Sequence, residues 1–168
     1  MDGTKEFIKR NGEFTVNIAL IENNTPVLGI IFVPVTQILY WGGKSIGAFK
    51  KEEEKVKSIK VSNRTQSLTA VGSRSHAGEN KMLAQYDIKE EINIGSSLKF
   101  CMVAEGIADI YLRENPTMEW DTAAGQAILE GAGGIMTALD GTLFPYNKIN
   151  MMNSGFVCLN GGLEVLQW

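Results

Sequence analysis

Cysteine and histidine are scarce in this sequence, and this limits the kinds of site that it can build. The 168 residues include two cysteines, Cys101 and Cys158, and one histidine, His76. Two cysteines are too few for a disulfide framework, and these two lack the spacing of paired metal ligands, so we expect both to be small core residues. A single histidine excludes a histidine-rich metal cluster.

Long hydrophobic runs are also missing. No apolar run approaches the ~20 residues that a membrane-spanning helix needs, and residues 1–6 lack the basic-then-apolar pattern of a signal peptide. We therefore expect a cytoplasmic protein with no membrane span.

The sequence has no excess of positive charge. Sixteen lysine and arginine residues stand against nineteen aspartate and glutamate residues, which gives a net charge of −3 at pH 7. This balance disfavours broad electrostatic binding to nucleic acid, so we expect no nucleic-acid partner, and an anionic ligand would need a local cationic or metal site. Because 44% of the residues are hydrophobic, the chain can bury a core as one domain or as two small ones.

Residues 14–49 have the patterns of an antiparallel sheet. Apolar residues at a period of two predict a half-buried strand, which is carried by Phe14, Val16, Ile18 and Leu20. Residues 27–33 are apolar on both faces, as in a central strand, and residues 38–41 and 45–49 flank two glycines like a hairpin. The charged run over residues 50–60 is interpreted as a solvated connector. It places a domain boundary near residue 60, between residues 1–60 and residues 61–168.

Strand and helix patterns alternate in residues 61–168, which predicts an α/β fold class. Strands are expected over residues 68–71, 107–112, 135–138 and 156–159, and a short helix over residues 79–86. A second helix should follow the hydroxyl caps of residues 95–97 and extend through Glu105. A third should start at Trp120, where apolar residues recur at i, i+3, i+4, i+7 and i+8, and end at Gly131.

Two aspartates have settings that suit metal chemistry. Asp2 precedes a Gly-Thr pair, and Asp121 lies at the start of a predicted helix. Carboxylates are hard oxygen ligands that suit Mg²⁺. Each aspartate also has an ordinary interpretation, because an aspartate at a helix start usually caps backbone N–H groups and Asp-Gly is a common turn dipeptide. The same tripeptide recurs at Asp140, where we interpret it as a plain turn.

Two segments resemble motifs of the inositol monophosphatase superfamily. Residues 1–19, MDGTKEFIKRNGEFTVNIA, are similar to the segment that starts inside the superfamily motif Asp-Pro-x-Asp-Gly-Thr, and residues 120–125, WDTAAG, are similar to its second motif, Trp-Asp-x-Ala-Ala-Gly. The Lys-Glu-Phe-Ile extension at residues 5–8 resembles the branch of CysQ-type 3′(2′),5′-bisphosphate nucleotidases. Residues 72–76 and 95–99 lie between the two motifs, so the resemblance covers essentially the whole chain.

The resemblance implies a layered α/β sandwich and a Mg²⁺-dependent, lithium-inhibited phosphomonoesterase that converts adenosine 3′,5′-bisphosphate to AMP and phosphate. It implies that Asp2 and Asp121 are metal ligands and that Asp2 and Thr4 are catalytic, with the Thr4 hydroxyl orienting the attacking water. The backbone N–H groups of Gly3 and Thr4 would hold the phosphate. Further contacts to the nucleotide substrate would come from Ser75, His76, Gly95, Ser96, Lys99 and Asp121. The resemblance also implies a cytoplasmic location, with a peripheral position at the inner membrane as a variant.

The sequence departs from the family pattern at its start, because Met1 stands where the preceding Asp-Pro-x is expected. We therefore expect a C-terminal part of a nucleotidase without its N-terminal layer, in which residues 1–60 are a remnant of the antiparallel-sheet domain. Such a chain would have impaired activity, and its bare sheet would self-associate or pair with a chain that supplies the missing part. Two alternatives stay open: a phosphatase of the same superfamily that acts on inositol or sugar phosphates, and an inactive fragment that serves only as a folded or assembling unit.

Overall fold

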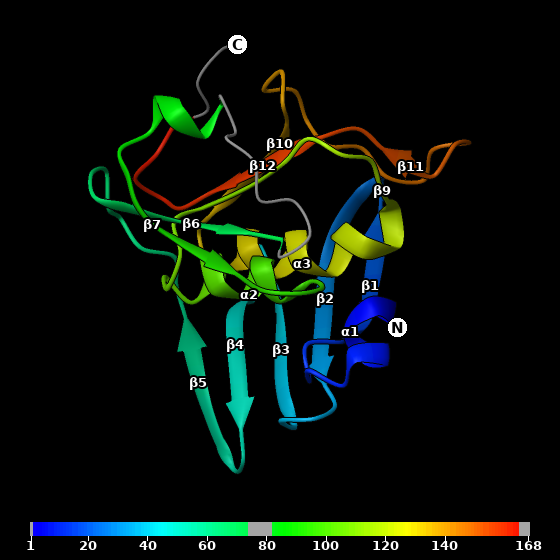
Figure 1. Cartoon of the computed structure of the whole chain (residues 1–168). Coiled ribbons are helices and arrows are strands. Elements are labelled where there is room, and N and C mark those ends of the chain that lie inside the picture. Colours follow the sequence, from blue (N-terminus) through cyan, green and yellow to red (C-terminus); the bar gives the residue numbers. More distant parts are fainter. Residues whose placement is uncertain (1, 74–81, 165–168) are drawn as a thin grey trace.

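Two β-sheets enclose a layer of two helices in the computed structural model, which describes residues 2–73 and 82–164 (Figure 1). The first sheet is an antiparallel meander of five strands in sequential order. Its strands are β1 (Val16–Glu22), β2 (Thr25–Val33), β3 (Ile38–Gly43), β4 (Gly47–Glu52) and β5 (Lys55–Ile59). The predicted antiparallel sheet is therefore confirmed, with β1 and β5 at its two edges.

The second sheet has five strands in the order β10-β12-β8-β6-β7. Its strands are β6 (Leu68–Gly72), β7 (Ile88–Asn93), β8 (Ile110–Arg113), β10 (Ile135–Ala138) and β12 (Phe156–Leu159). Strand β6 runs parallel to both β7 and β8, and the other pairs are antiparallel. A separate pair joins β9 (Thr117–Met118) to β11 (Met152–Asn153). Strand β7 was not predicted. The helix expected over residues 79–86 lies partly outside the described residues, and the described part holds a single 3₁₀ turn, η1 (Leu83–Gln85).

Helices α2 (Leu98–Ala104) and α3 (Glu119–Gly131) lie between the sheets and contribute to both cores, whereas α1 (Thr4–Lys9) lies beside the first sheet (Figure 1). The predicted α/β sandwich is thus confirmed, together with the positions of both internal helices. Close packing depends on glycine: a Cβ atom on Gly125 would lie 2.3 Å from Cγ of Phe100. Trp120, expected on the buried face of α3, is instead 59% exposed.

The charged run over residues 50–60 is not a solvated connector, and that prediction is wrong. It forms most of the β4–β5 hairpin. Lys50 donates to the buried carboxylate of Glu105 at 3.1 Å, and the Tyr40 hydroxyl donates to the same carboxylate at 2.6 Å. The charges lie on β4 and on the edge strand β5, where long side chains can keep their heads in water or reach a partner.

Strand β1 has the predicted period of two, but its apolar triplet lies on the outer face. Val16, Ile18 and Leu20 are exposed, while Ala19 and Ile21 are partly buried and pack toward the helices. The cause is the close approach of α3 to the first sheet. Ala19 is the partner of Gly29 of β2, and a Cβ atom on Gly29 would collide with the carbonyl oxygen of Ala124 of α3, so small residues are required at this point of the inner face.

A buried carboxylate joins the second sheet to the segment between the two sheets. Asp109, whose side chain has no exposed area, accepts hydrogen bonds from Ser62, from Arg64 Nε at 3.0 Å, from Asn160 Nδ2 at 2.8 Å and from the Thr69 N–H at 2.8 Å. The chain passes from the first sheet to the second between Ile59 and Leu68. Because α2 and α3 pack on both sheets, the division of the chain near residue 60 stays a prediction. Within the described residues, no helix has the length and apolarity to cross a membrane.

Candidate active site

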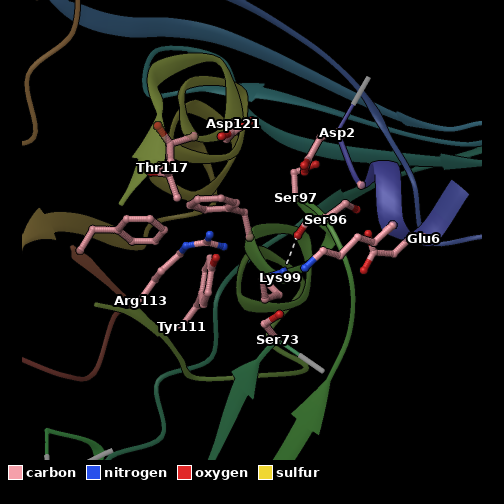
Figure 2. A pocket seen from close by; sticks show the side chains of 15 residues that line it. Asp2, Glu6, Ser73, Ser96, Ser97, Lys99, Tyr111, Arg113, Thr117 and Asp121 are labelled. Carbon is pink, nitrogen blue, oxygen red and sulfur yellow. Dashed lines mark hydrogen bonds between the residues drawn. The ribbon is translucent and has the colours of Figure 1, made fainter. Parts of the chain in front are cut away.

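A cavity of about 190 Å³ lies where the N-terminal segment meets the starts of α2 and α3 and the end of β8 (Figure 2). It is lined by Asp2, Gly3, Lys5, Glu6, Ser73, Ser96, Ser97, Lys99, Phe100, Tyr111, Arg113, Thr117, Asp121, Thr122 and Phe156. The lining residues come from segments that are far apart in the sequence. Both aspartates singled out from the sequence, together with Gly3, Ser96 and Lys99, are among them.

Asp2 is held in place by its own backbone. Its N–H donates to the Thr15 carbonyl at 2.9 Å and its carbonyl accepts from the Thr15 N–H at 3.0 Å, which makes an antiparallel bridge just before β1. Burial raises the pKa of the Asp2 carboxyl, the negative charge of Asp121 raises it further, and the positive charge of Lys99 opposes both. The two aspartates therefore lie close enough for the charge of Asp121 to act on Asp2, and their shared role as metal ligands stays a prediction.

Asp121 also stabilises the start of α3. Its Oδ2 accepts a hydrogen bond from the Met118 N–H at 3.0 Å, and the helix begins at Glu119. The capping interpretation is therefore confirmed, although Asp121 is the third residue of the helix and not the cap itself. Capping and ligand binding are compatible, since a carboxylate has two oxygens and several lone pairs.

Gly3 and Thr4 form the start of α1. Gly3 has a φ of +89°, a conformation that side chains rarely tolerate, so the Asp-Gly pair is needed for the turn from Asp2 into the helix. Thr4 is exposed and does not line the cavity, in contrast to its neighbours Gly3 and Lys5. The catalytic role of the Thr4 hydroxyl stays a prediction.

The loop before α2 is fixed by Glu13. The Gly95 N–H donates to Oε2 of Glu13 at 2.7 Å, and a Cβ atom at position 95 would lie 2.5 Å from Cγ of Glu6. Gly95 does not line the cavity, whereas Ser96 does. Gly95 thus serves the close packing of this loop against the N-terminal segment, and its predicted contact with a nucleotide is untested.

Lys99 is the most deeply buried cation of the cavity, with 3% of its surface exposed. Its Nζ donates to the carbonyls of Ser96 at 2.6 Å and Ile94 at 3.2 Å and lies 5.4 Å from the centre of the Tyr111 ring. Burial lowers the pKa of the Lys99 ammonium to about 8, although the charge of Asp2 counteracts this shift. An ammonium has three donors, so a third can point to a ligand.

Arg113 is the functional candidate that sequence reasoning missed. It is the last residue of β8, it lines the cavity, and its charge contributes to the lowered pKa of Lys99. Its position at the end of a predicted strand, shortly before the WDTAAG segment, was the available signal. Figure 2 shows Arg113 and Lys99 below Asp2 and Asp121. Ser75 and His76 lie outside the described residues, so their predicted role is not tested.

The lining of the cavity therefore combines three carboxylates, of Asp2, Glu6 and Asp121, with three cations, of Lys5, Lys99 and Arg113. Within residues 2–73 and 82–164, no carboxylate lies within ion-pair distance of Lys99 or Arg113. The positive charges are thus available to an anion, and the carboxylates are available to a cation. A ligand that carries an anionic group at each end, one of them bound through a metal ion, matches this arrangement.

The donor set fits a single Mg²⁺ ion. Mg²⁺ is commonly held by one or two carboxylates, with waters and substrate phosphate oxygens completing its shell, and Asp2 and Asp121 supply two such carboxylates in one cavity. In the part of the chain that the structure describes, no group of three or more histidine, cysteine, aspartate or glutamate side chains could hold a metal ion. A centre that holds several metal ions with protein ligands alone is not built from these residues.

Comparisons with known proteins show the family to which the chain is similar. A family model described as "Inositol monophosphatase family" matches residues 1–165. The 3′(2′),5′-bisphosphate nucleotidase CysQ of Salmonella typhimurium is 46% identical over 159 residues, which cover 93% of this chain and 64% of the relative. CysQ of Buchnera aphidicola is 42% identical over 168 residues, which cover 93% of this chain and 60% of the relative. The chain thus spans less than two thirds of the length of these relatives.

Solved structures have the same arrangement of elements. The crystal structure of CysQ from Bacteroides thetaiotaomicron superposes with a TM-score of 0.83 at 39% identity, over 95% of this chain and 67% of that chain. An inositol monophosphatase from Anabaena superposes with a TM-score of 0.75 at 30% identity, over 96% of this chain and 64% of that chain.

Proposed function

The chain belongs to the inositol monophosphatase family, and from this premise we propose that it is the substrate-binding part of a Mg²⁺-dependent 3′(2′),5′-bisphosphate nucleotidase, with adenosine 3′,5′-bisphosphate as substrate and AMP and phosphate as products. The observation that carries this proposal is the pairing of Asp2 and Asp121 with Lys99 and Arg113 in one cavity. The similarity to relatives named bisphosphate nucleotidases supports it.

The substrate class follows from the charges. A nucleoside bisphosphate carries one phosphate that is cleaved and one that is not, so its site needs a metal-binding end and a second anion-binding end. Lys99 and Arg113 supply the second end, because an arginine fork binds phosphate oxygens in pairs and a lysine binds them as a point charge. A phosphatase of inositol monophosphate has no second phosphate to bind, so these two cations, which have no carboxylate partner within the described residues, favour the bisphosphate.

Different residues of the chain would then have different roles in hydrolysis. Asp2 and Asp121 hold the cation, and Mg²⁺ at such a site supplies charge neutralisation at the phosphate and activation of a bound water. Gly3 allows the backbone to turn closely beside the phosphate position, and Lys99 and Arg113 fix the orientation of the substrate. Because no group of three or more ligating side chains is found within the described residues, we expect slow hydrolysis by the 168-residue chain alone.

The test measures ligand affinity, so it does not depend on a fast enzyme. Isothermal titration calorimetry in the presence of Mg²⁺ should show binding of adenosine 3′,5′-bisphosphate. Lys99→Ala and Arg113→Ala should each raise its Kd by about tenfold or more, which corresponds to one charge-assisted contact of ~1.5–3 kcal/mol. Binding of inositol monophosphate should hardly change. Lys89→Ala is the matched control, because the Lys89 side chain is 65% exposed and does not line the cavity.

Two results would contradict the proposal. Equal losses for both ligands would mean that Lys99 and Arg113 serve the fold or the cleaved phosphate, and the alternative of an inositol or sugar phosphate phosphatase would then be favoured. Absence of binding by the folded wild-type chain would favour a fragment that acts only as an assembling unit. Phosphate release with and without Mg²⁺, compared with Asp121→Asn, measures the residual hydrolysis.

A further inference from the structure

Tyr111 is a residue of the cavity wall that has no role in the function described so far. It lies on β8, two residues before Arg113, and lines the cavity together with Arg113 and Lys99. Side chains two residues apart point to the same face of a strand, so β8 presents Tyr111 and Arg113 side by side. Only 3% of the surface of Tyr111 is exposed. A nearly buried side chain with a polar end thus forms part of the candidate active site.

The Tyr111 hydroxyl differs from those of the other three tyrosines. Each of the others donates its proton to an oxygen of the protein at 2.6–3.3 Å: Tyr40 to Glu105, Tyr86 to Glu164 and Tyr146 to Gln126. Among the residues that the structure describes, no oxygen accepts a hydrogen bond from Tyr111. Because buried tyrosine hydroxyls usually have a partner, the acceptor expected for Tyr111 is an atom of a ligand in the cavity.

The direction of the Tyr111 side chain is fixed by two other aromatic rings. Tyr111 meets Phe100 of α2 and Phe156 of β12 edge to face, with ring centroids 5.1 Å apart in both pairs and interplanar angles of 84° and 88°. Edge-to-face pairs are a favoured arrangement of aromatic rings. Phe100 and Phe156 are themselves buried. The hydroxyl is therefore held in one place before a ligand arrives.

Tyr111 contacts both of the cations that were assigned to the second anion-binding end. The Nζ atom of Lys99 lies over the ring, 5.4 Å from its centre, and the hydroxyl points toward the guanidinium of Arg113 (Figure 2). Burial raises the pKa of the Tyr111 hydroxyl, while the positive charge of Arg113 and a hydrogen bond from its side chain lower it. A guanidinium only donates hydrogen bonds, so this contact uses the phenol oxygen and leaves the phenol proton for another acceptor.

We propose that Tyr111 is a further ligand-binding residue of this cavity, whose hydroxyl donates to an oxygen of the bound anion and accepts from Arg113. The second contact fixes the direction of the arginine fork. An ammonium, a guanidinium and a phenol then surround one tetrahedral anion. The assignment of that anion as the uncleaved phosphate of a nucleoside bisphosphate rests on the proposed function.

Sulfate is the probe that tests this inference, because it is a tetrahedral dianion that requires neither Mg²⁺ nor a nucleoside. Its Kd for the 168-residue chain is measured by NMR titration at constant ionic strength without Mg²⁺. Tyr111→Phe removes the hydroxyl and keeps the ring that packs against Phe100 and Lys99. It should raise the Kd by about fivefold, which is the scale of one net hydrogen bond. In an Arg113→Ala background the same replacement should raise the Kd by less than about twofold, because the fork that Tyr111 directs is then missing.

Tyr40→Phe is the matched control. Tyr40 is buried like Tyr111, but its hydroxyl donates to Glu105 and it does not line the cavity. Its replacement should lower the Tm and leave the Kd for sulfate unchanged. If Tyr111→Phe does not fold, fluorine NMR of the wild type labelled with fluorotyrosine provides the readout. The Tyr111 signal should then move with added sulfate while the Tyr40 signal does not, and a Tyr111 signal that stays in place would refute the contact.

Four results would overturn the proposal: no sulfate binding by the wild type, an unchanged Kd in Tyr111→Phe, an equal rise in both Arg113 backgrounds, or an equal rise in Tyr40→Phe. Failure of the proposed function gives a different pattern. If sulfate behaves as expected but adenosine 3′,5′-bisphosphate does not bind, the Tyr111 contact stands and the proposed substrate is wrong. If the bisphosphate binds through Lys99 and Arg113 but Tyr111→Phe is neutral, the substrate stands and the Tyr111 contact is wrong.

Discussion

Replacement of Asp109 by asparagine should destabilise the protein by about 3 kcal/mol. The Asp109 carboxylate accepts four hydrogen bonds in a site without exposed area. An asparagine oxygen can keep the donors that converge on Oδ1, but its NH₂ group then faces the Thr69 N–H, which leaves two donors opposed. The loss of a hydrogen bond to a charged group costs ~1.5–3 kcal/mol and an unpaired buried N–H costs a further ~1–3 kcal/mol, so about 3 kcal/mol is a low estimate.

Urea and thermal unfolding, followed by circular dichroism, measure this effect. For a domain of this size a loss of ~3 kcal/mol corresponds to a decrease in Tm of about 6–12 °C. Asp140→Asn is the matched control. Asp140 also accepts local hydrogen bonds, from the N–H and hydroxyl of Thr142, but it is exposed, so its replacement should change the stability little.

The pH dependence provides an independent check. Burial alone would raise the pKa of the Asp109 carboxyl, but hydrogen bonds led by that from Ser62 outweigh burial and hold it below its ordinary value. A carboxyl whose pKa is lower in the folded state stabilises that state above its unfolded pKa of ~3.9, and this stabilisation is lost as the pH falls through the folded pKa. The wild type should therefore lose stability in acid more steeply than Asp109→Asn. An Asp109→Asn variant as stable as the wild type at pH 7, or with the same acid slope, would refute this reasoning.

Three further predictions concern the site and the core. Asp121→Asn should abolish Mg²⁺ binding in calorimetry and keep the Tm near that of the wild type, since asparagine retains an oxygen that can accept from the Met118 N–H; an unchanged Mg²⁺ affinity would exclude Asp121 as a ligand. Gly125→Ala should lower the free energy of unfolding by ~1–3 kcal/mol in urea titrations, because the added Cβ collides with the Phe100 ring; a neutral effect would mean that α2 can shift. Because the pKa of Lys99 is about 8, the affinity for adenosine 3′,5′-bisphosphate should fall as the pH rises through 8, and Lys99→Met should flatten this part of the profile.

The fold could be predicted from the sequence where hydrophobic period and glycine position act locally. The strands that became β2 and β12 and the helix that became α3 follow from apolar patterns in their own residues. Strand β7, with the sequence IKEEIN, could not be found in this way, because its polar residues are typical of a sheet edge and its pairing with β6 is determined by tertiary structure. The same holds for the charged β4–β5 hairpin.

The candidate site shows a similar limit. Asp2 and Asp121 could be identified because each lies in a motif, and the structure brings both to one cavity. Arg113 belongs to no motif and is recognised only from its position in space, at the end of β8 beside Lys99. The buried face of β1 could not be predicted either, since a period of two does not reveal which face of a strand is covered. That outcome depends on how closely α3 approaches Gly29.

The shared helical layer has a consequence for how the chain can be divided. Ala124 and Ile128 of α3 pack against the first sheet, while Ala123 and Leu129 of the same helix pack against the second. A protease that cut between Ile59 and Leu68 would sever the connection but leave α3 inserted between the sheets. The two pieces should therefore stay associated after cleavage, because either piece alone would expose a face that the helix covers in the intact molecule.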